Sequence, residues 1–549
     1  MLPPGLRSPR EVTLYYDEVY FSLINSGQAV PFVYPWATAG AALVLLYLLI
    51  DHRKSPALAW ARFPVLGLLL AFQAWCIATN RARSPAAAFG VGLISSWGTL
   101  WVAAIMVAND CQVDFKRIER TSDDAVNEAV APSENGNRTN GVVQGQLGSF
   151  NIRQRKSPAD SEPSTDLQDA PRNRHDRLYW QSYPASPFSA RVSWVADVFC
   201  SFRGVGWTWQ TSGIPPPPRW VEAQMQATDN DVNVGDYRGS EELMISRTGI
   251  RRCADRSALL TNAAISLVIG YILLDGIKTL MHRDPYFWGY VDSEAPPCLP
   301  ALITNSHILT RTYRLVLSLA GIYTALWTIF KLGPACFCGV LGPKWLGVRG
   351  EAWMNPADMF GSYNMVLTKG LAGWWGGWWH QTFRLAFEAP SVRLLKATGI
   401  DKHSFSGKAL SLFIAFFLSG CLHASGSYTQ LGDTRPLLGP MRFFLLQAVG
   451  ILVQTVTTQQ LKRAGLVDKC PKLLRQATNF TLVHIWLYHT APLLVDDFAK
   501  GGIWLFEPVP FSPFRGLGYG APDDQFFAFW NGLAWWRNGE HWWDIGIAL

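Results

Sequence analysis

The stretch Leu412-Phe-Ile-Ala-Phe-Phe-Leu-Ser-Gly-Cys-Leu-His423 is almost entirely apolar and ends on an ionisable residue. A helix that crosses a bilayer needs about 20 mainly apolar residues, and apolar runs of this kind recur along the chain. An ionisable side chain inside a membrane is a functional candidate, because its polar group needs a partner there. The stretch therefore predicts a spanning helix with a functional histidine. The alternative is a histidine at the far interface, bonded to a neighbouring loop.

Eight windows of the sequence are apolar enough to predict membrane spans. They are residues 29–50, 63–78, 89–108, 257–274, 315–330, 409–422, 443–458 and 478–495. The sixth window is short, and the last two contain polar residues. The pattern predicts an all-α fold, a polytopic membrane helix bundle of about eight spans.

The composition supports a membrane protein. Of the 549 residues, 49% are hydrophobic and only 16% are charged, whereas soluble proteins carry about 25% charged residues. These values exclude a disordered, collagen-like or coiled-coil chain. The nine cysteines include no CxxC pair, so we expect neither a disulfide framework nor a metal site. The net charge of +7 fits cytosolic loops and anionic headgroups, and we expect no nucleic-acid partner.

A large polar insertion divides the chain. Residues 1–108 carry the first three spans, residues 109–256 form the insertion, and residues 257–499 form a membrane core with spans four to eight. Residues 500–549 are a Trp-rich tail. Within the insertion, residues 116–175 are predicted to be disordered, because they bury too little apolar surface to offset chain entropy.

The charges of the loops predict the orientation in the membrane. Basic residues concentrate after the first span, between the fifth and sixth, and after the seventh. With eight spans, these loops and the insertion fall on one side, which the positive-inside rule makes cytosolic. Both ends of the chain, including the tail at 500–549, are then lumenal or interfacial.

A second stretch with chemical potential is Leu371-Ala-Gly-Trp-Trp-Gly-Gly-Trp-Trp-His-Gln-Thr-Phe-Arg384. If it is helical, His380 and Arg384 lie four residues apart on one face. The tryptophans at 374 and 378, and at 375 and 379, are stacked at the same spacing. The alternative is an aromatic belt at the membrane interface, which explains the tryptophans but not the histidine and arginine.

Other polar residues in the predicted spans compete for the role of base. The eighth span carries His484, Tyr488 and His489. In the seventh, Gln447, Gln454 and Thr458 share roughly one helical face. Together they predict a polar cavity inside the bundle, and the sequence leaves open which histidine is the base.

Several signatures of soluble enzymes are absent from the sequence. It contains no HxxxD, no HExxH, no GxSxG and no GxxxxGK[ST]. These absences argue against serine-hydrolase, zinc-protease and P-loop chemistry.

The string Trp378-Trp-His-Gln-Thr-Phe-Arg384, followed about forty residues later by Leu418-Ser-Gly-Cys-Leu-His423, resembles the wax-synthase-like branch of the membrane-bound O-acyltransferases. Tyr271-Ile-Leu-Leu-Asp275 and Arg203-Gly-Val-Gly-Trp207 are similar to that branch too. The resemblance implies an acyltransferase fold in which an acyl group passes from acyl-CoA to an alcohol. It places His423 at the intramembrane catalytic position and His380 at the polar position of the acyl-CoA-binding motif.

On this resemblance, further residues are expected to bind substrate or acyl-CoA: Trp378, Trp379, Gln381, Arg384, Ser419, Gln454 and His484. Glycines stand before His380 where many relatives carry arginine, which leaves Arg384, Lys369 or Arg393 as candidates for a phosphate contact. Esterification by a thioester needs a base for the alcohol proton and a donor for the oxyanion. We expect His423 to be the base, Ser419 to orient it, and His380 to hold the thioester, with direct attack.

The same branch suggests the substrates. The resemblance to its fungal members favours acetyl-CoA as co-substrate and a hydroxyl of a terpenoid or meroterpenoid as acceptor. We expect no permanently bound cofactor. The alternative within the branch is a long-chain wax or sterol ester synthase. Outside it, a membrane transporter or a non-catalytic scaffold stays open. The expected surroundings are the lipid bilayer of the endoplasmic reticulum.

Overall fold

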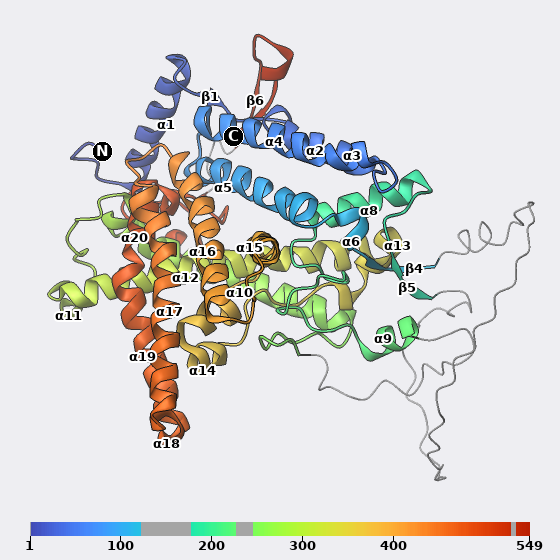
Figure 1. Ribbon diagram of the computed structural model, residues 1–549. Helices are drawn as coiled ribbons and strands as arrows, with labels where there is room; N and C mark the ends of the chain where they lie inside the picture. Colours follow the sequence, from blue (N-terminus) through green and yellow to red (C-terminus); the bar gives the residue numbers. More distant parts are fainter. Residues whose placement is uncertain (1, 122–176, 227–244, 529–533) are drawn as a thin grey trace, which may run out of the picture.

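The computed structural model describes residues 2–121, 177–226, 245–528 and 534–549. Throughout this part the chain is mainly helical, with short strands at the ends of helices (Figure 1). The long helices are α4 (Arg62–Thr79), α5 (Pro85–Val102), α10 (Arg256–His282), α12 (His307–Pro334), α16 (Phe405–Tyr428), α17 (Arg442–Arg463) and α19 (Lys472–Thr490). The prediction of an all-α fold is confirmed.

Shorter helices connect and cover the long ones. They are α1 (Pro9–Asn25), α2 (Ala39–Leu49), α3 (Pro56–Trp60), α6 (Cys111–Asp114), α8 (Phe188–Cys200), α9 (Arg219–Gln226), α11 (Ala301–Thr304), α13 (Gly342–Leu346), α14 (Asn364–Gly373), α15 (Arg384–Thr398), α18 (Leu466–Lys469), α20 (Pro492–Lys500) and α21 (Pro513–Gly516). The strands are β1 (Val30–Pro31), β2 (Val33–Tyr34), β3 (Asn80–Arg81), β4 (Arg117–Arg120), β5 (Leu178–Gln181), β6 (Trp535–Arg537) and β7 (Gly546–Ala548). Four π-helical segments occur at Ala103–Ala108, Ala335–Leu341, Trp374–Trp378 and Leu437–Met441.

Local sequence explains where the main helices begin. The side chain of Asp255 accepts a hydrogen bond from the backbone N–H of Ala258 at 2.7 Å and so caps α10. The Ser404 side chain caps α16 in the same way, through the N–H of Gly407 at 3.0 Å. Pro85 occupies the first turn of α5, where its missing N–H costs nothing.

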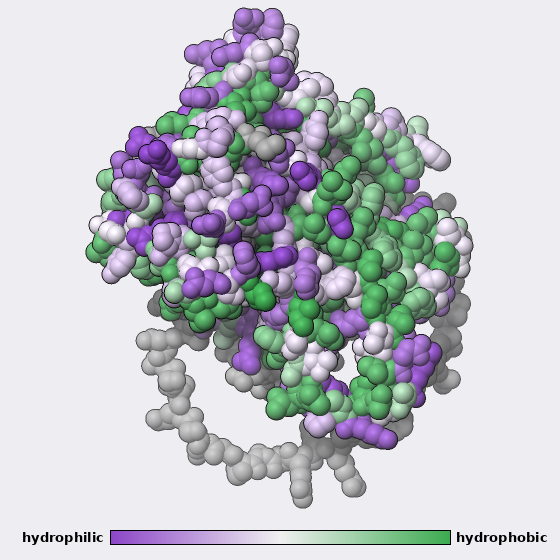
Figure 2. Space-filling view, turned by 90° about the vertical axis from the view of Figure 1, so that its left-hand side faces the viewer, coloured by the Kyte–Doolittle hydropathy of each residue, from purple (hydrophilic) through white to green (hydrophobic). Residues whose placement is uncertain are grey.

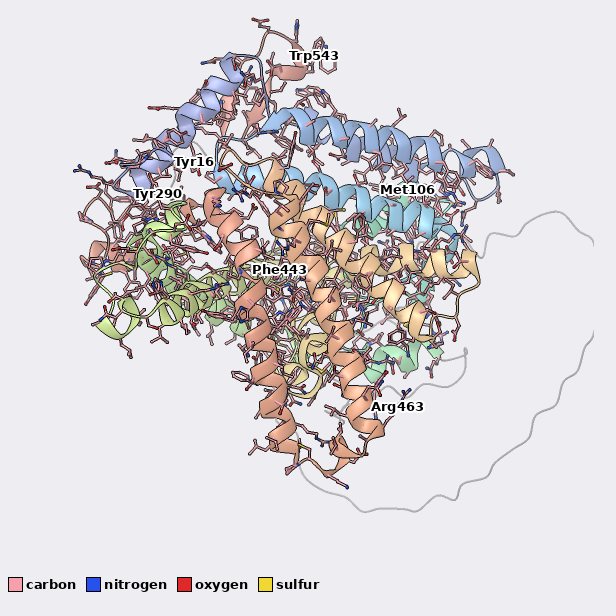
Figure 3. The ribbon with its side chains drawn as sticks, turned by 60° about the vertical axis from the view of Figure 1, so that its left-hand side comes forward. Tyr16, Met106, Tyr290, Phe443, Arg463 and Trp543 are labelled. Carbon is pink, nitrogen blue, oxygen red and sulfur yellow. The ribbon has the colours of Figure 1, made fainter. Side chains whose placement is uncertain are left out.

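Helix α16 lies at the centre of the bundle and contacts α5, α15 and α17. Small residues permit this packing. A side chain at Gly92 of α5 would lie 1.9 Å from the carbonyl oxygen of Ser425. The Ser96 hydroxyl donates to the Ser425 hydroxyl across the same contact at 2.7 Å. On the other side, α17 runs from the centre of the molecule, near Phe443, to its outer end at Arg463 (Figure 3).

In the described part of the chain, six helical segments are long and apolar enough to cross a membrane. They are Pro56–Thr79, Pro85–Ala108, Arg256–His282, His307–Gly350, Phe405–Tyr428 and Leu437–Arg463. The chain is thus a multi-pass membrane protein, and these segments cover six of the eight predicted windows.

The first and last windows differ from the prediction. In the first, prolines at 31 and 35 interrupt the run, and only Trp36–Leu49 is helical, which is shorter than a full span. The last window is divided between α19 and α20, and polar residues of α19 such as His484 and His489 lower its hydropathy.

The exposed surface fits a lipid environment. Several apolar side chains on α10 and α12 are exposed. Val268 and Val316, for example, are each 61% exposed. On the face shown in Figure 2, hydrophobic residues gather over one half and hydrophilic residues over the other. Such extensive apolar exposure is uncommon on a soluble monomer.

Part of the polar insertion is ordered. Arg117–Arg120, which falls within the segment predicted to be disordered, forms β4 and pairs antiparallel with β5. Arg117 is only 2% exposed and donates to Asp197 at 3.0 Å. Composition could not reveal this order, because the partners lie more than 50 residues away in the sequence. The rest of the predicted disordered segment, residues 122–175, lies outside the described residues.

The C-terminal strands pair with the segment that follows α1. β7 pairs with both β2 and β6, and the N–H of Leu549 donates to the carbonyl of Phe32 at 3.1 Å. The C-terminal strands therefore lie beside residues 32–34. The orientation of the chain in the membrane stays a prediction.

Candidate active site

His423 lies near the end of α16, one turn after Ser419. Its Nδ1 lies 2.8 Å from the carbonyl oxygen of Ser419. A carbonyl can only accept, so Nδ1 carries the proton and Nε2 of a neutral ring has a free lone pair. Among the described residues Nε2 has no hydrogen-bond partner. It is also not buried, unlike other side-chain nitrogens that lack a partner. It therefore faces accessible space with the lone pair that a general base needs.

Two neighbours fix this imidazole. The ring of Phe444 on α17 lies 4.3 Å from it, centroid to centroid, tilted by 33°. The contact of Ser419 with the ring is made by its backbone and not by its hydroxyl. The expectation that Ser419 orients the histidine thus applies to the carbonyl, which any residue at that position supplies.

The Trp-rich stretch is helical only in part. α14 ends at Gly373, residues Trp374–Trp378 form a π-helix, and Trp379 is extended. Arg384 begins a new helix, so His380 and Arg384 do not share a helical face as predicted. The break is stabilised by Gln381, whose amide donates to the carbonyl oxygens of Trp375 at 3.0 Å and Trp379 at 2.6 Å. π-helical turns are frequent at functional sites.

The tryptophans of this stretch pack inside the protein and not in an interfacial belt. Trp374 and Trp378 are 3% and 9% exposed, and their rings meet edge to face at 4.3 Å. Trp375 and Trp379 contact each other at 6.1 Å, also edge to face and not stacked. The cluster is enclosed by Phe416, Phe443 and Phe444, which lie between 5.7 and 6.0 Å from Trp375.

His380 follows this aromatic cluster and lies between Trp379 and Phe383, each 5.4 Å away. Burial lowers the pKa of His380 to about 3, and the neighbouring His423 and Arg203 act in the same direction. His380 is therefore neutral at physiological pH. Part of its surface remains accessible although protein surrounds the ring, which indicates that it faces an internal space.

The basic residues expected at a phosphate are placed less favourably. Arg384 donates to the side-chain oxygen of Gln381 at 3.0 Å and pairs with Glu388 at 2.7 Å. Lys369 and Arg393 lie exposed on the surface. Arg384 therefore has its own counter-ion.

Gln447 and Gln454 of α17 form hydrogen bonds to neighbouring helices. Gln454 accepts from the N–H of Leu371 at 2.8 Å and donates to Asn479 of α19 at 3.2 Å. Gln447 accepts from the indoles of Trp375 and Trp486. Thr458 is exposed. The predicted polar face therefore does not line one cavity, and Gln454 serves packing in this structure.

The remaining histidines of the bundle differ from His423. In His484, Nδ1 lies 2.7 Å from the carbonyl of Phe480, and Nε2 lies 3.3 Å from the Tyr363 hydroxyl. Both of its nitrogens thus have partners. His489 is exposed and contacts Tyr488. Of these three histidines, only His423 combines a fixed tautomer with a free Nε2.

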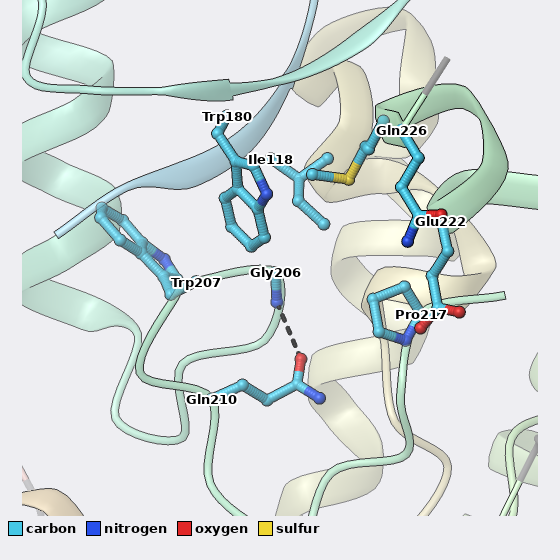
Figure 4. Close-up of a pocket in the computed structure, with 9 residues that line it drawn as sticks. Ile118, Trp180, Gly206, Trp207, Gln210, Pro217, Glu222 and Gln226 are labelled. Atoms are coloured by element: carbon cyan, nitrogen blue, oxygen red, sulfur yellow. Dashed lines mark hydrogen bonds between the residues drawn. The ribbon is translucent and has the colours of Figure 1, made fainter. Parts of the chain in front are cut away.

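Two pockets in the described part of the chain are lined by residues other than His380 and His423. One, of about 580 Å³, lies between α10 and α12, and its wall includes Phe360, whose ring is 6.2 Å from that of His380. The other, of about 370 Å³, lies in the insertion and is lined by Trp180, Trp207 and Glu222, with neighbouring residues shown in Figure 4. Glu222 is the charged residue of that lining, so the second pocket is poorly suited to a phosphate.

Sequence reasoning assigned no role to Phe360, Tyr323 and Arg203, which lie around this stretch. Phe360 and Tyr323 pack on Trp378, at 6.0 and 5.8 Å, and Arg203 acts on the charge of His380. Arg203 begins the Arg203-Gly-Val-Gly-Trp207 motif, so the motif itself was the available signal. Its closeness to His380, 177 positions later, could not be read from spacing.

These features define a class: a multi-pass membrane protein with two histidines packed among aromatic side chains of its interior. The model of the membrane-bound O-acyltransferase family matches residues 356–446, which include both histidines. Acetyltransferase eriL of Hericium erinaceus is 30% identical over 354 residues, which cover 62% of this chain and 76% of that protein. The chain therefore belongs to the membrane-bound O-acyltransferase family.

Two further fungal relatives match at lower identity. O-Mevalon transferase yanI of Aspergillus niger is 24% identical, over 49% of this chain and 53% of its own length. Acetyltransferase spyB of Aspergillus fumigatus is 24% identical, over 56% of this chain and 48% of its own. The chain thus matches about half the length of these two relatives. No solved structure matches it significantly.

Proposed function

We propose that the protein is an acyl-CoA-dependent O-acyltransferase that moves the acetyl group of acetyl-CoA to a hydroxyl of a hydrophobic secondary metabolite, a terpenoid or meroterpenoid, in the endoplasmic reticulum. The observation that carries the proposal is the free Nε2 of His423, fixed in its tautomer by the Ser419 carbonyl and close to a neutral His380. Acetyl as the acyl group is supported by the names of relatives such as eriL and spyB.

The proposed reaction begins with proton removal. Nε2 of His423 takes the proton of the acceptor hydroxyl as its oxygen attacks the thioester carbonyl. A tetrahedral intermediate forms and its carbonyl oxygen becomes negative. The C–S bond then breaks, the carbonyl reforms as an ester, and the CoA thiolate takes the proton from the His423 imidazolium. Atoms and charge balance without a covalent enzyme intermediate.

His380 is the proposed contact of the thioester. Because it is neutral, one ring nitrogen can donate to the acyl oxygen while the other accepts. Its Nδ1 is enclosed without a partner, so Nε2 is the nitrogen that faces accessible space. The aromatic walls formed by Trp378, Trp379 and Phe360 suit a polycyclic acceptor.

Label transfer in microsomes tests the proposal. Membranes with wild-type protein or His423→Ala are given labelled acetyl-CoA or labelled palmitoyl-CoA, with a panel of hydroxylated terpenoids, fatty alcohols and sterols. The proposal requires acetyl transfer to a terpenoid that depends on His423. Transfer of palmitoyl to a fatty alcohol or sterol would instead make the protein a storage-lipid synthase. Solute flux without CoA release would favour a transporter.

A further inference from the structure

Arg203 is held rigidly in the loop after α8. Gly204 and Gly206 adopt positive φ angles of 67° and 71°, which favour glycine. A side chain at Gly204 would lie 2.5 Å from the ring of Trp209, so the loop is closely packed. The Arg203 guanidinium donates through Nη1 to the carbonyl oxygen of Asp358 at 3.0 Å. The position of Arg203 is therefore set by the backbone of its own loop and by the backbone carbonyl of Asp358.

The charge of Arg203 is not matched by a bonded carboxylate. The carboxylate of Asp358 is bound to Lys331 at 2.6 Å, and it acts on Arg203 only through space, while its backbone oxygen accepts the hydrogen bond. Burial lowers the pKa of Arg203 to about 10, which still leaves it protonated at neutral pH. An enclosed cation without a bound anion is costly, and a ligand that gains negative charge offsets that cost.

Arg203 has free and accessible donors, and the residue it bonds lies close to the aromatic wall of His380. Among the described residues, only Nη1 has a hydrogen-bond partner. Nε and Nη2 have no partner, yet they are not buried, so both atoms are accessible. Nη1 bonds the carbonyl oxygen of Asp358, two residues before Phe360, whose ring lies 6.2 Å from that of His380. In keeping with this proximity, the charge of Arg203 lowers the pKa of His380.

We propose that Arg203 donates a hydrogen bond to the acyl carbonyl oxygen of the thioester and stabilises its negative charge in the tetrahedral intermediate. The role rests on the proposed acyl transfer. As the acceptor oxygen bonds to the carbonyl carbon, the carbonyl π electrons move to the oxygen held by the guanidinium. They return when the C–S bond breaks and the thiolate leaves. The phosphates of CoA lie at the far end of the pantetheine arm and are a poorer match for a cation beside the histidines.

Isotope-edited infrared spectroscopy tests this contact directly. Purified protein is mixed with acetyl-CoA labelled with ¹³C at the carbonyl, and the carbonyl stretch of the bound thioester is compared with that in solution. A hydrogen bond from Arg203 lowers the stretching frequency in the wild type. In Arg203→Gln this lowering should be lost while acetyl-CoA still binds. An unchanged frequency in the variant would overturn the proposal.

Arg252 supplies a matched control. It is also buried, at 8% exposed, and its guanidinium donates to the carbonyls of Pro215 and Pro216 at 2.9 and 3.0 Å. Like Arg203 it has no carboxylate partner, but it does not contribute to the pKa of His380. Arg252→Gln should therefore keep the bound carbonyl frequency of the wild type. A shift lost equally in both variants would show a general effect of removing a buried arginine.

Kinetics give a second readout. Loss of one oxyanion donor lowers kcat about 100-fold or more in other enzymes. Arg203→Gln should lower kcat by that factor, with a KM for acetyl-CoA within about threefold, and Arg203→Lys should lie between. A rise in KM with unchanged kcat would contradict an oxyanion role. If acetyl-CoA gives no bound carbonyl band even with wild-type protein, the proposed donor itself is wrong and the role of Arg203 falls with it.

Discussion

His423 and His484 lie in the same helical bundle and make the same local hydrogen bond. In each, Nδ1 lies within 2.8 Å of the carbonyl four residues earlier, which fixes the same tautomer. They differ at the other nitrogen. The Tyr363 hydroxyl lies 3.3 Å from Nε2 of His484, whereas Nε2 of His423 has no partner in the described part of the chain. A base needs a lone pair that no neighbour occupies, so the difference of one hydroxyl separates a structural histidine from a catalytic candidate.

The largest expected effect is on turnover. His423→Ala should reduce CoA release by about 1000-fold, since a general base contributes roughly 100- to 10,000-fold. His484→Ala and Ser419→Ala should each stay within about threefold of wild type. The measurement is His423-dependent CoA release per folded protein, with acetyl-CoA binding as the check on folding. Equal losses in the two histidine variants would end the distinction between them.

Gln447 tests how the aromatic cluster near His380 is held. It accepts from the indoles of Trp375 and Trp486, at 3.3 and 3.2 Å, and donates to Thr490. Gln447→Leu leaves two indole donors without an acceptor and should cost about 3 kcal/mol of stability. Thermal unfolding in detergent measures the loss, and Gln454→Leu is the comparison at the outer end of α17. A variant as stable as the wild type would show that these bonds contribute nothing.

His380 predicts a dependence of stability on pH. Its pKa is about 3 in the folded protein and about 6.5 when unfolded. As the pH falls below about 6.5 the unfolded chain binds a proton that the folded protein does not, so stability decreases until about pH 3. His380→Asn removes this penalty, which is about 2 kcal/mol at pH 5. Unfolding curves at pH 7 and pH 5 should therefore separate less in the variant. Parallel shifts in both proteins would refute a neutral, enclosed His380.

The smallest effect is expected at Tyr363. Tyr363→Phe removes the hydroxyl that occupies Nε2 of His484 and should cost about 1 kcal/mol of stability without changing kcat. This variant makes His484 resemble His423 at the imidazole. Combined with His423→Ala, it asks whether an unoccupied Nε2 at position 484 restores turnover. We expect no restoration, because His484 lacks the neighbouring His380 and Arg203.

Sequence patterns predicted much of the fold for a simple physical reason. Apolar runs of about 20 residues have few alternatives to a spanning helix, so six windows were confirmed. The first window failed because Pro31 and Pro35 interrupt it, a local feature that window averages hide. Strand β4 was missed because a strand depends on its partner, and β5 lies more than 50 residues away.

The sequence drew attention to the candidate histidines but not to their surroundings. His423 and His380 stood out as polar residues in apolar stretches. The helical face with Arg384 was wrong, because the chain leaves the helix at Trp379 and Gln381 bonds the freed carbonyls. The free Nε2 of His423 and the approach of Arg203 depend on tertiary contacts, which spacing in the sequence does not contain.

The central claim is that the unprotonated Nε2 of His423 has no hydrogen-bond partner in the described part of the chain, whereas the unprotonated Nε2 of His484 is bonded to the Tyr363 hydroxyl. Nitrogen-15 NMR of protein labelled in its histidines and held in lipid bilayers tests it, with His423→Gln and His484→Gln identifying the two signals. At neutral pH His423 should show a proton on Nδ1 and a bare Nε2 whose signal moves when the acceptor alcohol is added. The Nε2 signal of His484 should show the Tyr363 hydrogen bond and stay in place. A proton on Nε2 of His423, or no response to the acceptor, would contradict the account.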